Sequence, residues 1–209
     1  MRRAILPLTL LALLLGAGTA RAEIIEVGAL EEGVRGTCPR TCVAVSRTTG
    51  YQAKVGPTRG LYLVPRDGRI VAWTLALGEP GPTQIRFLDR RLGGEARAAL
   101  VVLQPGRRLR HRVVQKGPML RLRRFFGRRV QLPLARTLPV REGQLLALTV
   151  PTWAPVLQVN LGGDTSWRAS RPPRACDATD RRSALLGARR VAEFRCLYRT
   201  ARLTFSATL

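Results

Sequence analysis

The sequence predicts an all-β protein, a single β-sandwich whose strands are arranged like a jelly roll. Short apolar segments recur between Gly- and Pro-rich turns, and the 3.6-residue period of amphipathic helices is almost absent. Two of these segments echo one another: residues 61–78 read LYLVPRDGRIVAWTLALG, and residues 138–150 read LPVREGQLLALTV. In both, a turn of the form Arg-acid-Gly precedes an apolar strand. Two echoed strands match the double make-up of a jelly roll and are too few for a propeller or solenoid.

We expect both echoed segments to lie in the middle of a sheet. Successive side chains of a strand point to opposite faces, so Val71, Trp73 and Leu75 share one face of the first strand. Leu146 and Leu148 share a face of the second strand in the same way. The opposite face of each strand is also apolar, which is typical of a strand buried on both sides. The bulky faces are therefore predicted to pack together in one core.

The rest of the chain is expected to form shorter strands separated by turns. A hairpin is predicted at residues 42–55, with Thr48-Thr49-Gly50 as its turn. Residues 161–173 are expected to be a loop, and residues 183–192 are the one stretch with helical character. Other strands are expected at residues 23–27, 84–88, 96–103, 109–115, 120–123, 130–134, 156–160, 192–198 and 203–205.

Residues 1–22 have the form of a cleaved export signal. A positively charged start precedes an apolar run, and Ala-Arg-Ala at residues 20–22 fits the small-x-small rule for cleavage before Glu23. The run is shorter than the roughly 18 apolar residues that a membrane span needs, so we expect cleavage and not an anchor. Residues 23–209 are then expected to be one secreted domain, extracellular or associated with the cell envelope, without a membrane span.

Four cysteines in a chain expected to be exported predict two disulfides, for which three connectivities are allowed. We expect Cys38–Cys42, because the turn-prone residues around Pro39 can fold this short segment back. We expect Cys176–Cys196 to close the excursion before the final strands. Crossed pairings stay open, since they need only that the first and last strands be neighbours. A zinc site would need a second close Cys pair or His ligands, so neither a metal nor a cofactor is expected.

The sequence contains no recognisable catalytic motif. Its single histidine, His111, lies in a strand-like alternating stretch, which favours a histidine that faces the core. A pair of catalytic carboxylates would have to come from scattered residues such as Asp67, Glu142 or Asp164, and the first two are already explained by turns. Motifs for activated nucleophiles, phosphate-binding loops and zinc proteases do not occur in the sequence. We therefore expect a protein that is not an enzyme.

The strongest functional signal is a run of basic residues. The chain carries 36 Lys and Arg against 13 Asp and Glu, a net charge of +23, and residues 96–141 contain 13 basic residues and no acid. Guanidinium groups bind phosphate and carboxylate in a bidentate manner. The run therefore predicts a surface for an anionic polymer, with these residues as candidates: Arg110, Arg112, Arg121, Arg123, Arg124, Arg128 and Arg129.

The same run can also be accounted for without a ligand. An arginine-rich composition is also produced by a GC-rich genome, and charged side chains on the faces and edges of sheets oppose aggregation. If the surface does bind, an acidic cell-envelope polymer or polysaccharide is the expected partner. Nucleic acid is not expected, because the chain is expected to be exported and few aromatic side chains accompany the run.

Two tryptophans point to an alternative function, that of a carbohydrate-binding module for neutral sugars. Trp153 lies between two prolines and Trp167 lies close to Asp164, and both are candidates for stacking on a sugar ring. Packing of both indoles against the end of the sandwich explains them without a ligand and is the interpretation that we favour. A third alternative is a purely structural or interaction domain.

Three segments carry a resemblance to other sequences. They are VPRDGRIVAW at residues 64–73, LPVREGQLLALTVPTWAP at residues 138–155 and the C-P-x-x-C motif at residues 38–42. Together they resemble a group of exported actinobacterial proteins to which no activity is assigned. The resemblance extends over most of the chain after the export signal. It implies a single β-sandwich domain and adds no functional residues.

Overall fold

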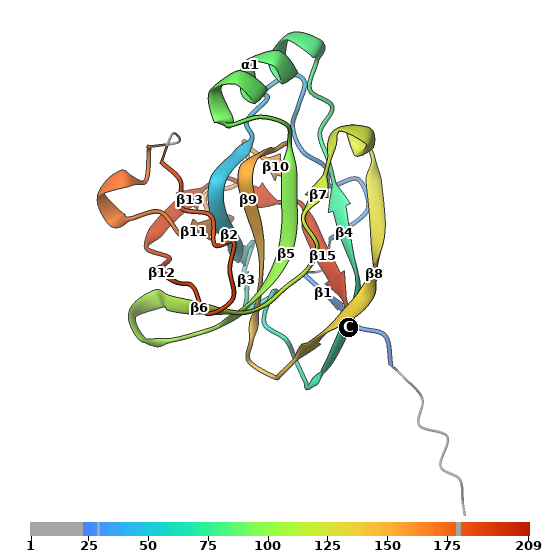
Figure 1. The fold of residues 1–209 in the computed structure, drawn as a ribbon, viewed down its shortest axis with the longest axis vertical. Helices are drawn as coiled ribbons and strands as arrows, with labels where there is room; N and C mark the ends of the chain where they lie inside the picture. The colour runs from blue at the N-terminus through green and yellow to red at the C-terminus, as the bar shows by residue number, and fades with distance from the viewer. Residues whose placement is uncertain (1–22, 29, 179–180) are drawn as a thin grey trace, which may run out of the picture.

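The computed structural model describes residues 23–28, 30–178 and 181–209 (Figure 1). The expected export signal at residues 1–22 lies outside the described residues. Within them the chain forms antiparallel β-strands in two main sheets, with a single α-helix and short 3-10 turns. The predicted all-β class is therefore confirmed. Across these described ranges no helix is long and apolar enough to cross a membrane.

The smaller sheet has four strands and brings together segments from both ends of the described chain. Their order is β1 (Glu26–Val27), β15 (Phe205–Thr208), β4 (Gly68–Ala76) and β8 (Arg129–Val140), and each neighbouring pair is antiparallel. Backbone hydrogen bonds between Ile25 and Leu209 extend the β1–β15 pair. Strand β4, which lies within the first echoed segment, has a neighbour on each side in this sheet, as predicted.

The larger sheet is strongly curved (Figure 1). Its main strands follow the order β12 (Val191–Glu193), β6 (Arg110–Lys116), β5 (Arg97–Gln104), β9 (Leu145–Ala154), β2 (Val45–Val55), β11 (Ser166–Ala169) and β13 (Cys196–Arg199). Two short strands, β3 (Thr58–Arg59) and β7 (Leu120–Arg121), pair with β2 and β5, while β10 (Leu157–Gln158) pairs with β14 (Arg202–Leu203). The apolar strand of the second echoed segment begins β9, which lies between β5 and β2, again as predicted.

Side chains from both sheets form one hydrophobic core. Trp73 and Leu75 of β4 and Leu146 and Leu148 of β9 are at most 1% exposed and belong to the same cluster. The bulky faces of the echoed strands therefore share a core, as expected from their alternation. The jelly-roll connectivity of the strands stays a prediction.

The predicted alternation is wrong at Val71. The pairing of β4 with β8 shifts register between Ile70 and Ala72, so that Ile70 is fully buried and Val71 is 45% exposed. Such an irregularity moves the side chains on one side of it to the opposite face. A strict period of two cannot reveal it, because the shift depends on the partner strand.

The hairpin expected at residues 42–55 is also wrong. Strand β2 runs from Val45 to Val55 without a turn, and Gly50 lies in its middle. A Cβ atom at Gly50 would come within 2.7 Å of the Trp167 ring, so this glycine permits close packing between β2 and β11 and makes no turn. The chain turns instead at Gly56, where φ is +55°, before it enters β3.

The strand expected at residues 84–88 is instead part of helix α1 (Pro82–Leu92). Pro82 occupies the first helical position, and the N–H of Gly81 donates to the Gln84 side chain at 2.8 Å. Gly93 ends the helix in the left-handed region, with φ of 92°. A window of five residues is too short to distinguish a helical period from a strand.

Three expectations for the last third of the chain are wrong. Residues 161–173 contain β11, which places Trp167 between β2 and β13 instead of in a loop. Residues 183–192 form no helix, and the first part of this segment bonds to β2. The strand expected at residues 192–198 is divided between β12 and β13, which pair with β6 and β11. In each case the structure follows distant pairing partners that local composition does not contain.

Both disulfides have the predicted pairing. Cys38–Cys42 joins residues whose α-carbons are 4.0 Å apart, and Cys176–Cys196 joins residues whose α-carbons are 5.3 Å apart. The first closes the turn that precedes β2, and the second ties the segment after β11 to the start of β13. The crossed pairings are thereby excluded.

Removing each disulfide tests how much it constrains the unfolded chain. Cys176→Ala with Cys196→Ala is expected to lower the free energy of unfolding by about 3 kcal/mol, because this bond closes a loop of intermediate length. Cys38→Ala with Cys42→Ala opens a much shorter ring, so the expected loss is about 2 kcal/mol. Urea unfolding of the two variants measures both values. A larger loss for the short ring than for the long loop would contradict the prediction.

Candidate functional site

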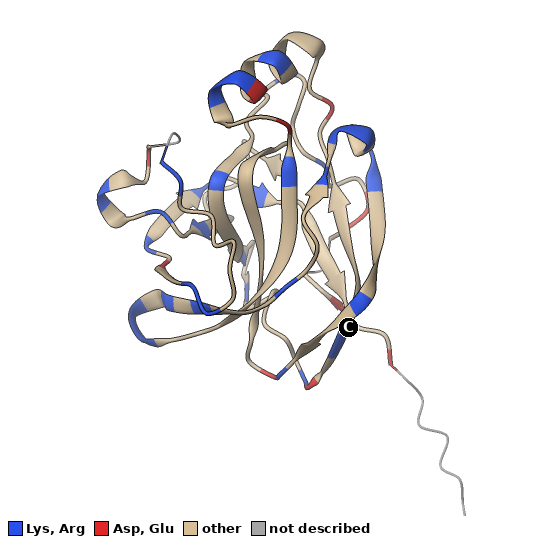
Figure 2. Ribbon diagram, in the orientation of Figure 1, with Lys and Arg blue, Asp and Glu red and all other residues tan. Residues whose placement is uncertain are grey.

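The predicted arginine run divides over three places in the fold (Figure 2). Its members lie on β6 (Arg110 and Arg112), around the end of β7 (Arg121, Arg123 and Arg124) and at the start of β8 (Arg128 and Arg129). Strands β6 and β7 both pair with β5, but at its opposite ends. Gln104 at one end faces Arg112 of β6, and Arg97 at the other end faces Arg121 of β7. At about 3.3 Å per residue, these ends of β5 are roughly 23 Å apart. The run therefore does not form one continuous site.

The first group lines an open hollow of about 400 Å³, which we call the basic hollow. It lies where the end of β5 and the start of β6 meet β12. Three arginines supply its charge, and the remaining lining is neutral. The lining residues are Gln104, Pro105, Gly106, Arg107, Arg110, Arg112 and Val191.

Strand alternation directs Arg110 and Arg112 outward. His111 is 4% exposed and Val113 is 1% exposed, so the side chains between and beyond the two arginines face the core. Both arginines are exposed. This division between inward apolar or aromatic residues and outward arginines is the one expected from the sequence of the strand.

A tight turn before β6 brings Arg107 to the same hollow. A Cβ atom at Gly106 would lie 2.4 Å from the carbonyl oxygen of Arg110, so the close approach requires glycine. Arg108 and Leu109 adopt positive φ values of 55° and 60°, an uncommon backbone region for such residues. The N–H of Gly106 also donates to Nδ1 of His111 in a long hydrogen bond of 3.4 Å. The buried histidine thus helps to hold the turn.

No acidic residue lines the basic hollow. Glu193 of β12 is opposite Arg110 in the strand register, but its carboxylate binds the Nε of Arg195 at 2.9 Å. Within the described residues, Arg107, Arg110 and Arg112 form no ion pair. Three exposed guanidinium groups are therefore gathered without a carboxylate to neutralise them.

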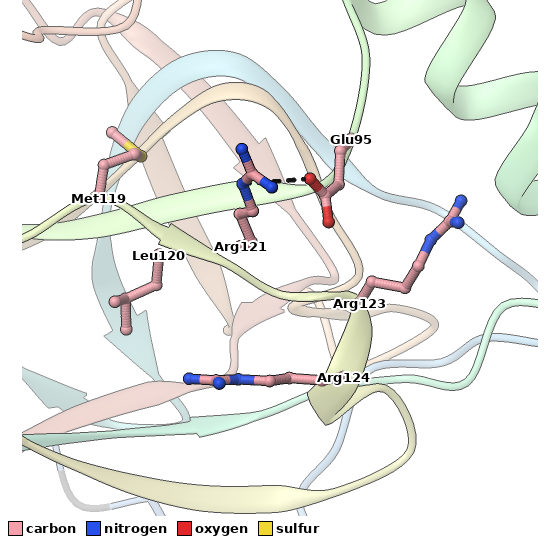
Figure 3. Close-up of a pocket in the computed structure, with 6 residues that line it drawn as sticks. All are labelled: Glu95, Met119, Leu120, Arg121, Arg123 and Arg124. Atoms are coloured by element: carbon pink, nitrogen blue, oxygen red, sulfur yellow. Dashed lines mark ion pairs between the residues drawn. The ribbon is translucent and has the colours of Figure 1, made fainter.

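The second group borders a larger hollow of about 730 Å³, whose lining includes one acid, Glu95 (Figure 3). Arg121 lies 3.5 Å from the carboxylate of Glu95, and Arg123 lies 2.9 Å from that of Asp89. The Arg124 guanidinium lies over the ring of Phe125, 4.5 Å from its centroid. Two of these three arginines are thus already paired within the protein, and their charge is less available to a ligand.

Arg128 and Arg129 do not extend either hollow. Arg129 donates to the backbone carbonyl oxygens of Leu30 and Glu31 at 2.5 and 2.7 Å, which attaches the segment after β1 to β8. Arg128 is exposed in the turn that enters β8. The structure thus gives Arg129 a structural role and leaves Arg128 apart from the basic hollow.

Both tryptophans proposed for sugar stacking are buried. Trp153 is fully buried, its indole N–H donates to Asp89 at 2.9 Å, and Phe126 packs on its ring at 5.5 Å between centroids. Trp167 is 4% exposed and stacks on Tyr198 at 4.5 Å. Neither indole offers a free face to a sugar, in line with the packing interpretation.

The structure adds Arg107 to the residues that the sequence assigned to a site. Its position in the charge run was the only available signal, because the turn that brings it beside Arg110 and Arg112 depends on a close backbone contact at Gly106. The described residues contain no group of three or more His, Cys, Asp or Glu that could hold a metal ion.

Burial of His111 predicts that the stability of the fold depends on pH. Its ring packs against both Tyr51 and Phe194, at centroid distances of 5.5 and 5.1 Å, and burial lowers its pKa below the ordinary value. A hydrogen bond with the backbone of Arg110 opposes this shift, and the positive charge of Arg168 adds to it. The folded protein therefore binds the proton less readily than the unfolded chain does.

Stability should consequently fall as the pH falls from about 6.5, the ordinary histidine pKa, towards pH 5. His111→Phe keeps an aromatic ring and removes the titration, so its free energy of unfolding should change less over this interval. Urea unfolding at several pH values compares the two slopes. Parallel curves for the variant and the unaltered protein would show that His111 does not contribute.

The geometry separates an acid-free group of arginines on β6 from a partly neutralised group near β7. Comparison with protein-family models, with curated proteins and with solved structures finds no match to this chain.

Proposed function

We propose that the protein is a secreted, non-enzymatic binding protein that holds an anionic polymer at the cell envelope. The observation that carries this proposal is the basic hollow, in which Arg107, Arg110 and Arg112 are exposed around about 400 Å³ without a lining acid. The rest of the predicted arginine run contributes less, because Arg121 and Arg123 are paired with carboxylates.

The chemistry of the hollow favours carboxylate, sulfate or phosphate groups. Each guanidinium is a planar donor that binds two oxygens of such a group at once. Exposed contacts of this kind are individually weak in water, so several repeated charges are needed for useful affinity. A linear polymer supplies them, which makes an acidic polysaccharide or another acidic envelope polymer the expected ligand.

Other features agree with an exported protein that is not an enzyme. Two disulfides are typical of an oxidising compartment. The lone histidine is buried between aromatic rings and helps to hold a turn, which leaves it without access to a substrate. We therefore assign no catalytic residue and no cofactor. The alternative of a module for neutral sugars gains no support, since both candidate indoles are buried.

The proposal predicts a steep dependence of binding on salt and on β6. Retention on immobilised polygalacturonate, a linear polymer of carboxylates, should decrease strongly as sodium chloride rises from low concentration to several times the physiological level. Arg110→Ser with Arg112→Ser should weaken binding about tenfold or more at low salt, because two charge-assisted contacts are lost. Retention on neutral dextran should be negligible throughout.

Two control variants separate the basic hollow from overall charge. Arg59→Ser with Arg199→Ser removes the same charge from exposed positions on β3 and β13 and should weaken binding much less. Arg121→Ser with Arg123→Ser removes guanidinium groups that are already paired and should also have the smaller effect. Equal losses of affinity in all three variants would show that binding depends only on net charge and not on the basic hollow. Retention that survives high salt would also contradict the proposal.

A further inference from the structure

A second surface lies at the end of the molecule where helix α1 stands beyond the strands (Figure 1). Two adjoining hollows of about 340 and 440 Å³ share Cys42, Phe87 and Leu88 in their lining. The larger of them also includes Val43 and Leu92. We call this surface, between α1 and the segment that precedes β2, the Phe87 groove.

Large apolar side chains in the Phe87 groove are exposed to solvent. Phe87 is 54% exposed and Val43 is 42% exposed. Among the described residues seven large apolar side chains are exposed, and Phe87 is the only aromatic one. Single exposed apolar residues are ordinary, whereas neighbouring ones that line one depression are typical of interaction sites.

Both walls of the groove are held in place before any ligand arrives. On one side, Asp89 of α1 accepts the indole N–H of Trp153 at 2.9 Å, which fixes the helix on β9. On the other side, the Cys38–Cys42 disulfide constrains the segment that precedes β2. The Gln84 side chain of α1 donates to the Pro39 carbonyl oxygen of this segment at 2.8 Å. A groove with fixed walls loses little conformational entropy when it binds.

The charges beside the groove are positive. Helix α1 carries Arg86, Arg90 and Arg91, all exposed, and the Arg91 guanidinium lies 5.9 Å from the centroid of the Phe87 ring. The one acid of the helix, Asp89, is occupied by Trp153 and Arg123. An apolar groove beside unneutralised arginines is complementary to a ligand that is both apolar and acidic.

We infer that the Phe87 groove binds an acidic segment of a partner protein through one large apolar side chain. A leucine, isoleucine or phenylalanine of the partner would pack against Phe87 and Val43, while neighbouring carboxylates meet the arginines of α1. A membrane surface fits less well, because the other large apolar residues of α1 (Ile85, Leu88 and Leu92) pack against the core. An acidic polysaccharide has no apolar side chain to place in the groove. The inference is independent of the basic hollow.

A peptide selection tests the inference directly. Randomised 12-residue peptides displayed on phage are selected on the purified protein, and the enriched peptides are expected to combine Asp or Glu with a large apolar residue. Fluorescence anisotropy then measures the affinity of the most enriched peptide. Phe87→Ser should weaken binding at least tenfold, as expected for a central aromatic contact. Arg91→Ser should weaken it less and should reduce its dependence on salt.

Two controls show whether the peptide is bound at the groove itself. Val71→Ser replaces an apolar side chain of similar exposure on β4 and should leave the affinity unchanged, while Phe87→Ser should keep the unfolding temperature of the unaltered protein. The inference is overturned if no acidic and apolar consensus is enriched, or if Phe87→Ser binds the peptide normally. Vesicles of phosphatidylcholine and phosphatidylglycerol that co-sediment with the protein only when Phe87 is present would identify a membrane as the occupant and likewise overturn it.

Discussion

Two threonines buried at the centre of the larger sheet join its middle strands to the segment that covers them. The Thr49 hydroxyl of β2 donates to that of Thr149 in β9 at 2.8 Å, and both hydroxyls bond to Leu185, through its N–H at 2.8 Å and its carbonyl oxygen at 3.3 Å. A buried hydroxyl that loses its hydrogen-bond partner costs about 1–3 kcal/mol. Moving the segment around Leu185 away from the two threonines is therefore unfavourable. This segment leads to β12, which pairs with β6 and contributes Val191 to the basic hollow. Hydrogen bonds inside the sheet thus help to position the segment that leads to the basic hollow.

The placement of a few acids decides which arginines are available to a ligand. Asp89 and Glu95 come before the acid-free run in sequence, yet they reach Arg123 and Arg121 in space. Asp89 also satisfies the buried Trp153, so one carboxylate serves both the packing of the helix and the neutralisation of a cation. The part of the run on β6 has no such neighbour. A charge run in a sequence is therefore a set of candidates from which the fold selects.

Local patterns predicted what depends on local geometry. Alternation identified β4, β9 and the outward arginines of β6, and the spacing of the cysteines indicated both disulfides. The failures occur where a distant partner decides: Gly50 accommodates the Trp167 ring instead of making a turn. The favoured packing of Trp153 agrees with the structure, but its partner Asp89 lies in α1, where a strand was predicted at residues 84–88 although Pro82 and Gly93 are local signals of a helix start and end. Arg107 joined the site through a backbone contact at Gly106 that no periodicity contains.

Strand β15 stands between β1 and β4, and this position affects the order in which the chain can fold. Thr208 lies 182 residues after Glu26, whose carboxylate it binds at 2.8 Å. Neither β1 nor β4 can pair with β15 before residues 205–208 are present, so β1 lacks its neighbour in the smaller sheet and the β4–β8 pair stays open on one side during synthesis of most of the chain. Pairing over such long separations is slow to form. The two parts of the smaller sheet, β1 on one side and the β4–β8 pair on the other, are therefore joined late, by a strand of only four residues.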